Sequence, residues 1–149
     1  MIIDNIEYLF ITPKSEFYSA TIELRYKVFY EQTNSPYSCV YDDLEDSSFH
    51  LLAVSNSEVV GYLRLTIENG IGQLTQFLVL ENMRGKARIA HNLFMLMIDK
   101  AKKNNVHSLW GEIRLHMDHA ARYYGFTVFE EIFPSEKTGI PHKRIEMVL

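Results

Sequence analysis

The sequence predicts one α+β domain covering residues 1–149, with a mixed, mostly antiparallel central sheet of six to seven strands flanked by about four helices. Three observations indicate this class. The length is typical of a chain with a single hydrophobic core. Hydrophobic residues make up 47% and charged residues 23% of the chain, with only 7 Gly and 4 Pro, which is ordinary globular usage. Segments with helical periodicity alternate with strand-like segments, without an internal repeat or a linker.

The first helix is expected over residues 14–30. Thr12 is placed to cap it and Pro13 to occupy its first position, and Phe17 begins the run of apolar residues at helical spacing. Asn34-Ser35-Pro36 ends this helix, and we expect it to be the first of a helix pair.

Three strands are expected next, over residues 49–54, 59–67 and 73–80. Asn69-Gly70 lies between the last two strands, and both residues tolerate the positive φ of a type I′ turn. Polar and apolar residues alternate along these strands, which is typical of a half-buried antiparallel meander.

The remaining elements follow from the same periodicities. We expect a helix from about residue 87 to 103, a strand over 106–113, a short helix over 116–124 closed by Gly125, a strand over 126–133, a loop over 134–141 and a terminal strand over 142–149.

Charge and cysteine content restrict the partners and the compartment. The net charge is −4, so we expect neither nucleic acid nor a membrane as a partner. Cys39 is the only cysteine, which excludes an internal disulfide and favours a reducing compartment. The sequence has no basic N-terminal region and no apolar run of about 18 residues, so we expect a cytoplasmic protein. Sheet edges often pair, and the chain is expected to be a monomer or a homodimer.

The junction between the strand ending at Leu80 and the next helix is the most informative chemical feature. A helix N-terminus offers unpaired N–H groups and a partial positive charge. Arg84, Lys86 and Arg88 add three cations there, and Gly85 permits close approach of a ligand to the backbone. The junction therefore suits a diphosphate, although the same cations would also suit a solvated turn.

The stretch Val79-Leu80-Glu81-Asn82-Met83-Arg84-Gly85-Lys86 resembles the pyrophosphate-binding loop of the GNAT superfamily of N-acetyltransferases, and the order of elements is similar too. Further motifs resemble the ElaA-like subgroup of that superfamily. They are Arg25, Val28-Phe29 and Glu31-Gln32, then Asp43-x-x-Asp46, His50-Leu51 and Gly61-x-x-Arg64-Leu65, and finally Tyr124-Gly125-Phe126 and Gly139-Ile140-Pro141-His142.

The resemblance implies a GNAT-like fold and acetyl transfer from acetyl-CoA, as co-substrate, to a primary amine of a small molecule or peptide. The amine would attack directly in a ternary complex, without a metal. A backbone N–H near Val79 would polarise the thioester carbonyl where its strand parts from the strand over 106–113. The residues expected to bind the cofactor are Phe77, Leu78, Val79, Arg84, Gly85, Lys86, Ala87, Arg88, Ile89 and Ala90.

The loop departs from the family pattern Arg/Gln-x-x-Gly-x-Gly/Ala at both small positions, which are Ala87 and Ile89 here. A positive φ at Ala87 would be strained by about 1 kcal/mol. Ile89 is expected to crowd the phosphates, unless the loop shifts by one residue so that Ala90 takes the small position.

The resemblance also implies site residues. Tyr124 would return a proton to the leaving thiolate, with Tyr123 as the competing candidate; both could instead be core aromatics. The strand over 73–78 has no carboxylate, so the base is expected to be Glu112, with His116 as the other titratable candidate. The alternative for Glu112 is a salt-bridged strand residue.

Arg25, Asp43, Asp46 and Arg64 form a second constellation, expected to bind substrate. Its members would either tie the first helix to the sheet by charge-assisted hydrogen bonds or draw a cationic amine toward the acceptor side.

Two other functions remain open at this point. Arg25, Val28-Phe29, the paired acidic residues and Arg64 are also similar to acyl-homoserine-lactone synthases. The altered loop would equally suit a catalytically impaired GNAT-fold protein that binds a ligand or a partner.

Overall fold

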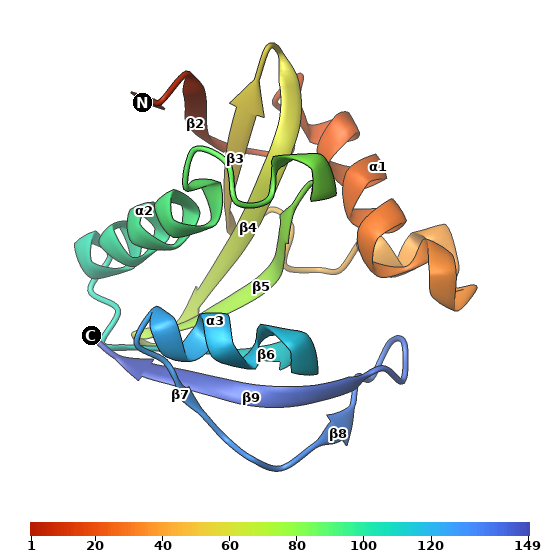
Figure 1. The fold of residues 1–149 in the computed structure, drawn as a ribbon, viewed down its shortest axis with the longest axis vertical. Coiled ribbons are helices and arrows are strands. Elements are labelled where there is room, and N and C mark those ends of the chain that lie inside the picture. Colours follow the sequence, from red (N-terminus) through yellow and green to blue (C-terminus); the bar gives the residue numbers. More distant parts are fainter.

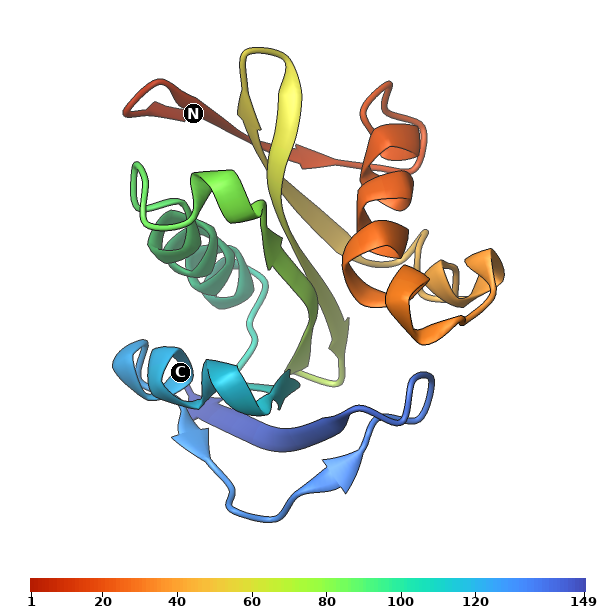
Figure 2. The same ribbon diagram turned by 45° about the vertical axis from the view of Figure 1, so that its right-hand side comes forward.

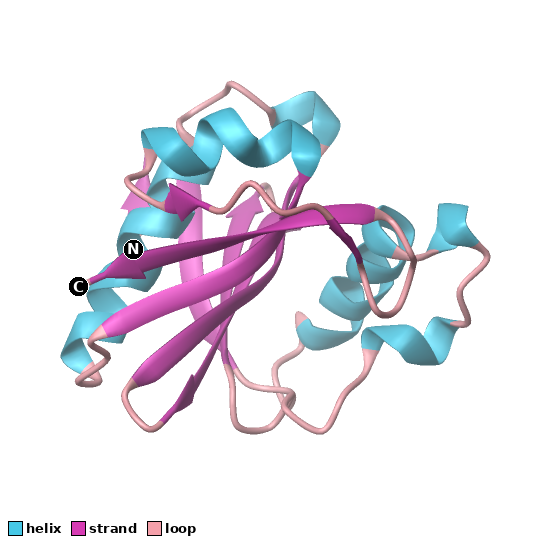
Figure 3. Cartoon of the chain, turned by 90° about the horizontal axis from the view of Figure 1, so that it is seen from below, coloured by secondary structure: helices cyan, strands magenta, loops and turns pink.

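The computed structural model describes residues 1–149 and has one sheet of nine strands between two groups of helices (Figures 1 and 3). The sheet order is β1-β2-β3-β4-β5-β6-β9-β7, and β8 also pairs with β9. Only β5 and β6 run parallel. The mixed, mostly antiparallel sheet is therefore confirmed, with more strands than the six to seven expected.

The strands are β1 (Ile2–Ile3), β2 (Ile6–Ile11), β3 (Phe49–Ser55), β4 (Glu58–Glu68), β5 (Ile71–Val79), β6 (Ser108–Arg114), β7 (Thr127–Val128), β8 (Phe133–Pro134) and β9 (Pro141–Val148). The α-helices are α1 (Tyr18–Phe29), α2 (Ile89–Lys103) and α3 (Asp118–Tyr123). Four short 3-10 helices complete the chain: η1 (Glu31–Thr33), η2 (Tyr37–Val40), η3 (Glu81–Met83) and η4 (Leu115–Met117). None of the helices is long and apolar enough to cross a membrane.

The N-terminal region differs from the prediction. Residues 2–11 form a hairpin that extends the sheet, and Ile6 and Tyr8 alternate into the core. Thr12 does not cap α1, because its hydroxyl accepts a hydrogen bond from the Lys14 N–H in the preceding turn, and the helix begins at Tyr18. The second member of the expected helix pair is reduced to η1 and η2.

The meander β3-β4-β5 is confirmed, and its turns have the expected backbone. Asn69 and Gly70 have φ values of 52° and 75°, as a type I′ turn requires. The strand expected over 126–133 is wrong in its centre, because only its two ends pair with β9. Glu130 lies in the unpaired part, where it bonds to Arg122 and Lys143 instead.

The core has one part on each face of the sheet. Leu51, Leu63, Leu93 and Met97 belong to the larger part, which lies under α2 and α3. The smaller part lies under α1 and is lined by Leu52, Val54, Val59, Tyr62 and Leu78. Figure 2 shows α1 and α2 on opposite sides of β3, β4 and β5.

The parallel pairing of β5 with β6 ends at Leu74 and Gly111. Beyond it β5 continues along β4 to Val79, while β6 continues along β9 to Arg114 (Figure 1). Gly111 permits the close approach just before the separation, because a Cβ there would lie 2.9 Å from the Leu74 carbonyl oxygen. The two strands thus open a gap in the middle of the sheet, which begins beyond Leu74 and includes Val79, where the resemblance implies that the strands part.

Candidate active site

Free backbone groups line the β5 side of the gap. The Leu80 N–H bonds to the Val60 carbonyl of β4. Because backbone groups alternate in direction along a strand, the N–H groups of Phe77 and Val79 point away from β4. The Val79 carbonyl on this edge accepts a hydrogen bond from Nε of Arg84 at 3.2 Å. The gap therefore offers preorganised N–H donors to a carbonyl oxygen.

A β-bulge at Gln76 sets the point at which β5 turns away. The β4–β5 register shifts between Tyr62 and Arg64, and Gln76 has a positive φ of 58°. A bulge bends its strand and strengthens the local twist. We infer that this bend separates β5 from β6.

The loop before α2 forms a concave row of backbone donors. Gly85, Ala87 and Arg88 have φ values of 75°, 50° and 51°. The N–H groups of these three residues, and those of Ala90 and His91 in the first turn of α2, bond to no protein acceptor. Successive N–H groups in such a conformation bind anions, and the helix N-terminus adds a partial positive charge.

The side chain at the altered position Ile89 turns into the core and away from the loop. Ile89 is only 2% exposed and packs in the core beside Gly61, whose missing Cβ leaves room for it. The expected crowding by Ile89 is therefore wrong, and its side chain does not line the loop. Ala90 follows with its N–H free. Ala87 does take the positive φ that is strained for a residue with a Cβ.

Asn92 holds this loop in place and was missed by sequence reasoning. Its amide group donates to the Ala87 carbonyl at 3.4 Å and to the Tyr8 hydroxyl at 3.1 Å. The helical spacing of three from Ile89 to Asn92 could have placed its side chain near the loop.

Arg84, Lys86 and Arg88 are exposed beside the free N–H groups, and none of them forms a salt bridge. Since no carboxylate neutralises these cations, they add to the positive potential at the start of α2. The residues present thus fit a diphosphate.

Tyr124 and Tyr123 differ sharply in position. Tyr123 is 72% exposed. The Tyr124 ring stacks on Phe94 at a centroid distance of 4.9 Å and lies 6.0 Å from the ring of His91, at the start of α2. Burial raises the pKa of Tyr124, and the charge of Arg88 opposes this rise. The Tyr124 hydroxyl has no protein partner and is not buried, so a neutral phenol is available as a proton donor.

His91 is a further group at this place that sequence reasoning missed. Its Nδ1 atom is buried without a hydrogen-bond partner. A buried polar atom is normally paired, so an unpaired one beside a candidate site is notable. His91 lies two residues after Ile89, in the first turn of the predicted helix, and this position could have placed it near the loop.

The structure does not bring Glu112 to the same face as Tyr124. Side chains alternate along β6, so Glu112 shares a face with Trp110 and Arg114, and Arg114 lies over Phe29 at the end of α1. Glu112 is exposed and forms no salt bridge, so the salt-bridged alternative is not seen. His116 is also exposed, in η4. Glu112 and Tyr124 therefore lie on opposite faces of the sheet.

Arg25 and Arg64 form a buried charge cluster on the α1 face. Both oxygens of Glu45 accept from Arg25, at 2.8 and 2.9 Å, and Glu45 also pairs with Arg64. Asp42 forms two hydrogen bonds with Arg64, each at 2.9 Å. Arg25 is 0% exposed. Two carboxylates thus neutralise two buried guanidinium groups.

The expected carboxylates Asp43 and Asp46 lie outside this cluster. Both are exposed, whereas Asp42 and Glu45, each one position earlier, point toward the sheet. The turn that begins at Asp42, whose side chain accepts from the Leu44 N–H, sets this orientation.

The cluster reaches the bulge and the adjacent strands. Nε of Arg25 donates to the Gln76 side-chain oxygen, and Nε of Arg64 donates to Thr75 at 2.9 Å. Tyr18 donates to Glu45 at 2.8 Å. Burial acts to raise the pKa of Glu45, but the hydrogen bonds and charge of Arg25 outweigh it and hold the pKa at about 2.

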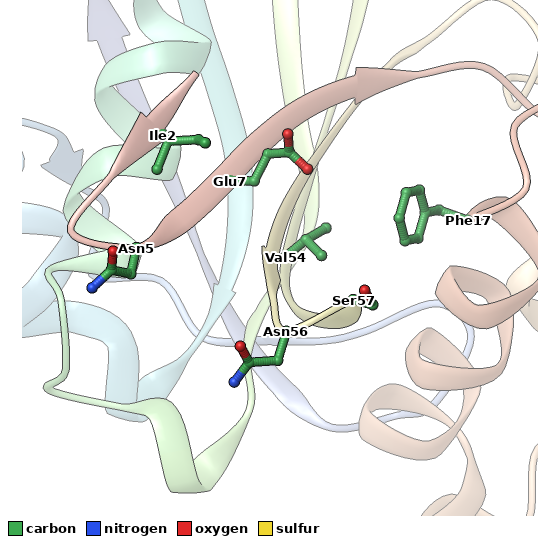
Figure 4. Close-up of a pocket in the computed structure, with 7 residues that line it drawn as sticks. All are labelled: Ile2, Asn5, Glu7, Phe17, Val54, Asn56 and Ser57. Atoms are coloured by element: carbon green, nitrogen blue, oxygen red, sulfur yellow. The ribbon is translucent and has the colours of Figure 1, made fainter.

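A cavity of about 210 Å³ lies at the β1–β2 edge of the sheet, between the N-terminal hairpin and the β3–β4 turn (Figure 4). Its lining consists of Ile2, Asn5, Glu7, Phe17, Val54, Asn56 and Ser57. Glu7 is the only charged side chain among them, and the cavity includes no residue of the gap or of the α2 loop.

Comparison with known proteins gives one family and several similar folds. Residues 14–126 match the family model described as the acetyltransferase (GNAT) family. Escherichia coli ElaA is 21% identical with a TM-score of 0.79, over 94% of this chain and 98% of ElaA. An acyl-CoA N-acyltransferase from Pseudomonas aeruginosa is 20% identical with a TM-score of 0.79, over 96% and 99% of the two chains.

FeeM, an N-acyl amino acid synthase from uncultured soil microbes, is 12% identical with a TM-score of 0.75, over 96% of this chain and 90% of FeeM. At these identities the structural matches describe the fold. No curated protein matches the sequence.

Proposed function

Because this chain belongs to the acetyltransferase (GNAT) family, we propose that it transfers an acetyl group from acetyl-CoA to a primary amine of a small molecule or peptide. The observation that carries the proposal is the gap between β5 and β6, which lies beside the free N–H groups at the start of α2. The gap suits a thioester, and the free N–H groups at the start of α2 suit a diphosphate.

The donor would bind along the free edge of β5. The N–H groups of Gly85, Ala87 and Arg88 support binding of the diphosphate, and Arg84 and Lys86 supply charge. In the gap, the Val79 N–H would donate to the thioester oxygen and stabilise the negative charge that develops on it during attack.

The amine nitrogen would then attack the thioester carbon directly. A C–N bond forms, the C–S bond breaks, and the electron pair of the broken bond leaves with sulfur. Tyr124 would give its hydroxyl proton to the thiolate and regain one from solvent, since burial raises its pKa and keeps it neutral. Glu112, directly or through a water, would accept the proton lost by the amine.

Ligand-induced stabilisation tests the donor site. Acetyl-CoA at about 100 times its Kd should raise the free energy of unfolding by about 2.7 kcal/mol. Arg84→Glu should abolish this effect by placing a carboxylate among the free N–H groups. Lys102→Glu makes the same charge change at the far, exposed end of α2 and should retain the effect. An absent thermal shift with the wild-type protein at millimolar acetyl-CoA would contradict the proposal.

Turnover separates acetyl transfer from the other two functions. Release of CoA from acetyl-CoA in the presence of a panel of amines supports acetyl transfer. Release from long acyl donors only would favour synthase-like chemistry. CoA binding without thiol release from any donor would favour a binding protein. Arg25 and Arg64, which are similar to arginines of the acyl-homoserine-lactone synthases, are buried in the charge cluster. Their burial supports a structural role as the reason for this similarity.

A further inference from the structure

Helix α1 bridges the two strands that diverge at the gap. Arg25 donates from α1 to the side chain of Gln76 on β5. Phe29, one helical turn later on the same face, lies 5.9 Å from the guanidinium carbon of Arg114 on β6. Gln76 and Arg114 therefore both lie against α1, on the two strands that border the gap, and their contacts on the helix are one turn apart.

Both groups have unused hydrogen-bond donors. Arg114 forms neither a salt bridge nor a hydrogen bond with the protein. Arg25 has only donors, so the Gln76 atom that it contacts must be the carbonyl oxygen, and the Gln76 NH2 group is left for another acceptor. That nitrogen has no protein partner and is not among the buried unpaired atoms, so it is accessible.

The charged groups of the buried cluster and of Arg144 on β9 already have partners of opposite charge. Asp42 and Glu45 are neutralised by their two arginines and cannot attract a cation strongly. Arg144 stacks on Trp110 at 4.3 Å and pairs with Glu146. The unpaired charges along β6 are therefore the guanidinium of Arg114 and, two residues earlier on the same face, the carboxylate of Glu112, a separation of about 7 Å along the strand.

We propose that Arg114 and the Gln76 NH2 group bind the carboxylate of the acceptor, and that the acceptor is a free amino acid. This inference rests on the proposed function and narrows its amine class. An amino acid carries a carboxylate next to its amine, so binding at Arg114 holds the nitrogen between the gap and Glu112. The two unpaired charges of β6 then match the two charges of the zwitterion.

Matched acceptors provide the test. The twenty amino acids are assayed with acetyl-CoA by thiol release and mass spectrometry, and the best one is compared with its amide and its decarboxylated amine. The amino acid should have a KM at least about 30-fold lower than either analogue. In Arg114→Met, which keeps the aliphatic contact with Phe29, this preference should disappear while the KM for acetyl-CoA is unchanged. Arg114→Lys should restore part of the preference.

Arg144→Met is the control, because it removes a cation from the same face that already has a carboxylate partner. Equal KM values for the amino acid and its decarboxylated amine would overturn the inference and leave the proposed function standing. Absence of turnover with every amine would count against the proposed function. In that case calorimetry with CoA and the N-acetyl amino acids decides the inference: binding lost in Arg114→Met supports it, and no binding to the wild type overturns it.

Discussion

Glu45→Gln should be among the most destabilising single substitutions in this protein. Glu45 is 6% exposed, and it is the only carboxylate bonded to Arg25, whose side chain is 0% exposed. The substitution keeps the shape and one hydrogen-bond acceptor but leaves a buried guanidinium without a counter-charge. Breaking a buried ion pair in this way costs about 3 to 5 kcal/mol.

The pH dependence of stability gives a second value for the contribution of Glu45 to the free energy of unfolding. Glu45 has a pKa of about 2 in the folded protein against an ordinary value of 4.5, which corresponds to about 3 kcal/mol. Because the folded pKa is the lower one, this contribution is complete above pH 4.5 and is lost as the pH falls toward 2. Urea denaturation of Glu45→Gln should show lower stability at pH 7 and a shallower loss of stability between pH 5 and 2 than the wild type.

Neighbouring carboxylates supply the controls. Asp42→Asn leaves Arg64 with Glu45 and should cost about 1.5 kcal/mol. Asp43→Asn alters an exposed side chain and should change the free energy of unfolding by less than about 0.5 kcal/mol. The reasoning is refuted if Glu45→Gln costs no more than Asp43→Asn, or if the pH dependence of Glu45→Gln matches that of the wild type.

Three further predictions concern the site and the strands around it. Tyr124→Phe should lower kcat about 100-fold with little change in the KM for acetyl-CoA, and Tyr123→Phe should stay within about 3-fold; equal losses in a thiol-release assay would argue against Tyr124 as the proton donor. Ala87→Gly should raise the free energy of unfolding by about 0.5 to 1 kcal/mol, because glycine adopts the positive φ at this position without strain. Ala90→Gly, in the first turn of α2, should lower the free energy of unfolding by about 1 kcal/mol. If the urea midpoint falls for both variants, Ala87 is not strained. Gly111→Ala should cost about 1 to 3 kcal/mol, since its new Cβ would lie 2.9 Å from a carbonyl oxygen, and calorimetry showing an unchanged Tm would contradict this.

Local sequence signals predicted the central part of the fold. Asn69-Gly70 requires a positive φ at two successive residues, and alternation fixes the faces of the strands on either side, so the meander follows from short-range chemistry. Strand β2 was missed because its residues pair with β3, which lies some forty residues later in the chain. Tertiary pairing of that kind leaves little local trace.

The same distinction explains the outcome at the site. The position of the cationic loop before α2 was predictable, since a strand, a glycine and three cations precede a helix. The sequence could not predict which carboxylates contact the arginines. Four carboxylates occur within five residues, and the turn that begins at Asp42 directs only two of them toward the sheet. Asp42 and Glu45, not Asp43 and Asp46, are selected. The burial of the Ile89 side chain was likewise not predictable, because it depends on the space that Gly61 of β4 leaves beneath α2.

The opposite placement of α1 and α2 has a consequence for divergence within this fold. The residues that suit the nucleotide end of a donor belong to α2 and the loop before it, while those that frame the other mouth of the gap belong to α1 and the end of β6. Under the proposed function, substitutions in one set leave the other intact, so a lineage can change one co-substrate while it still binds the second.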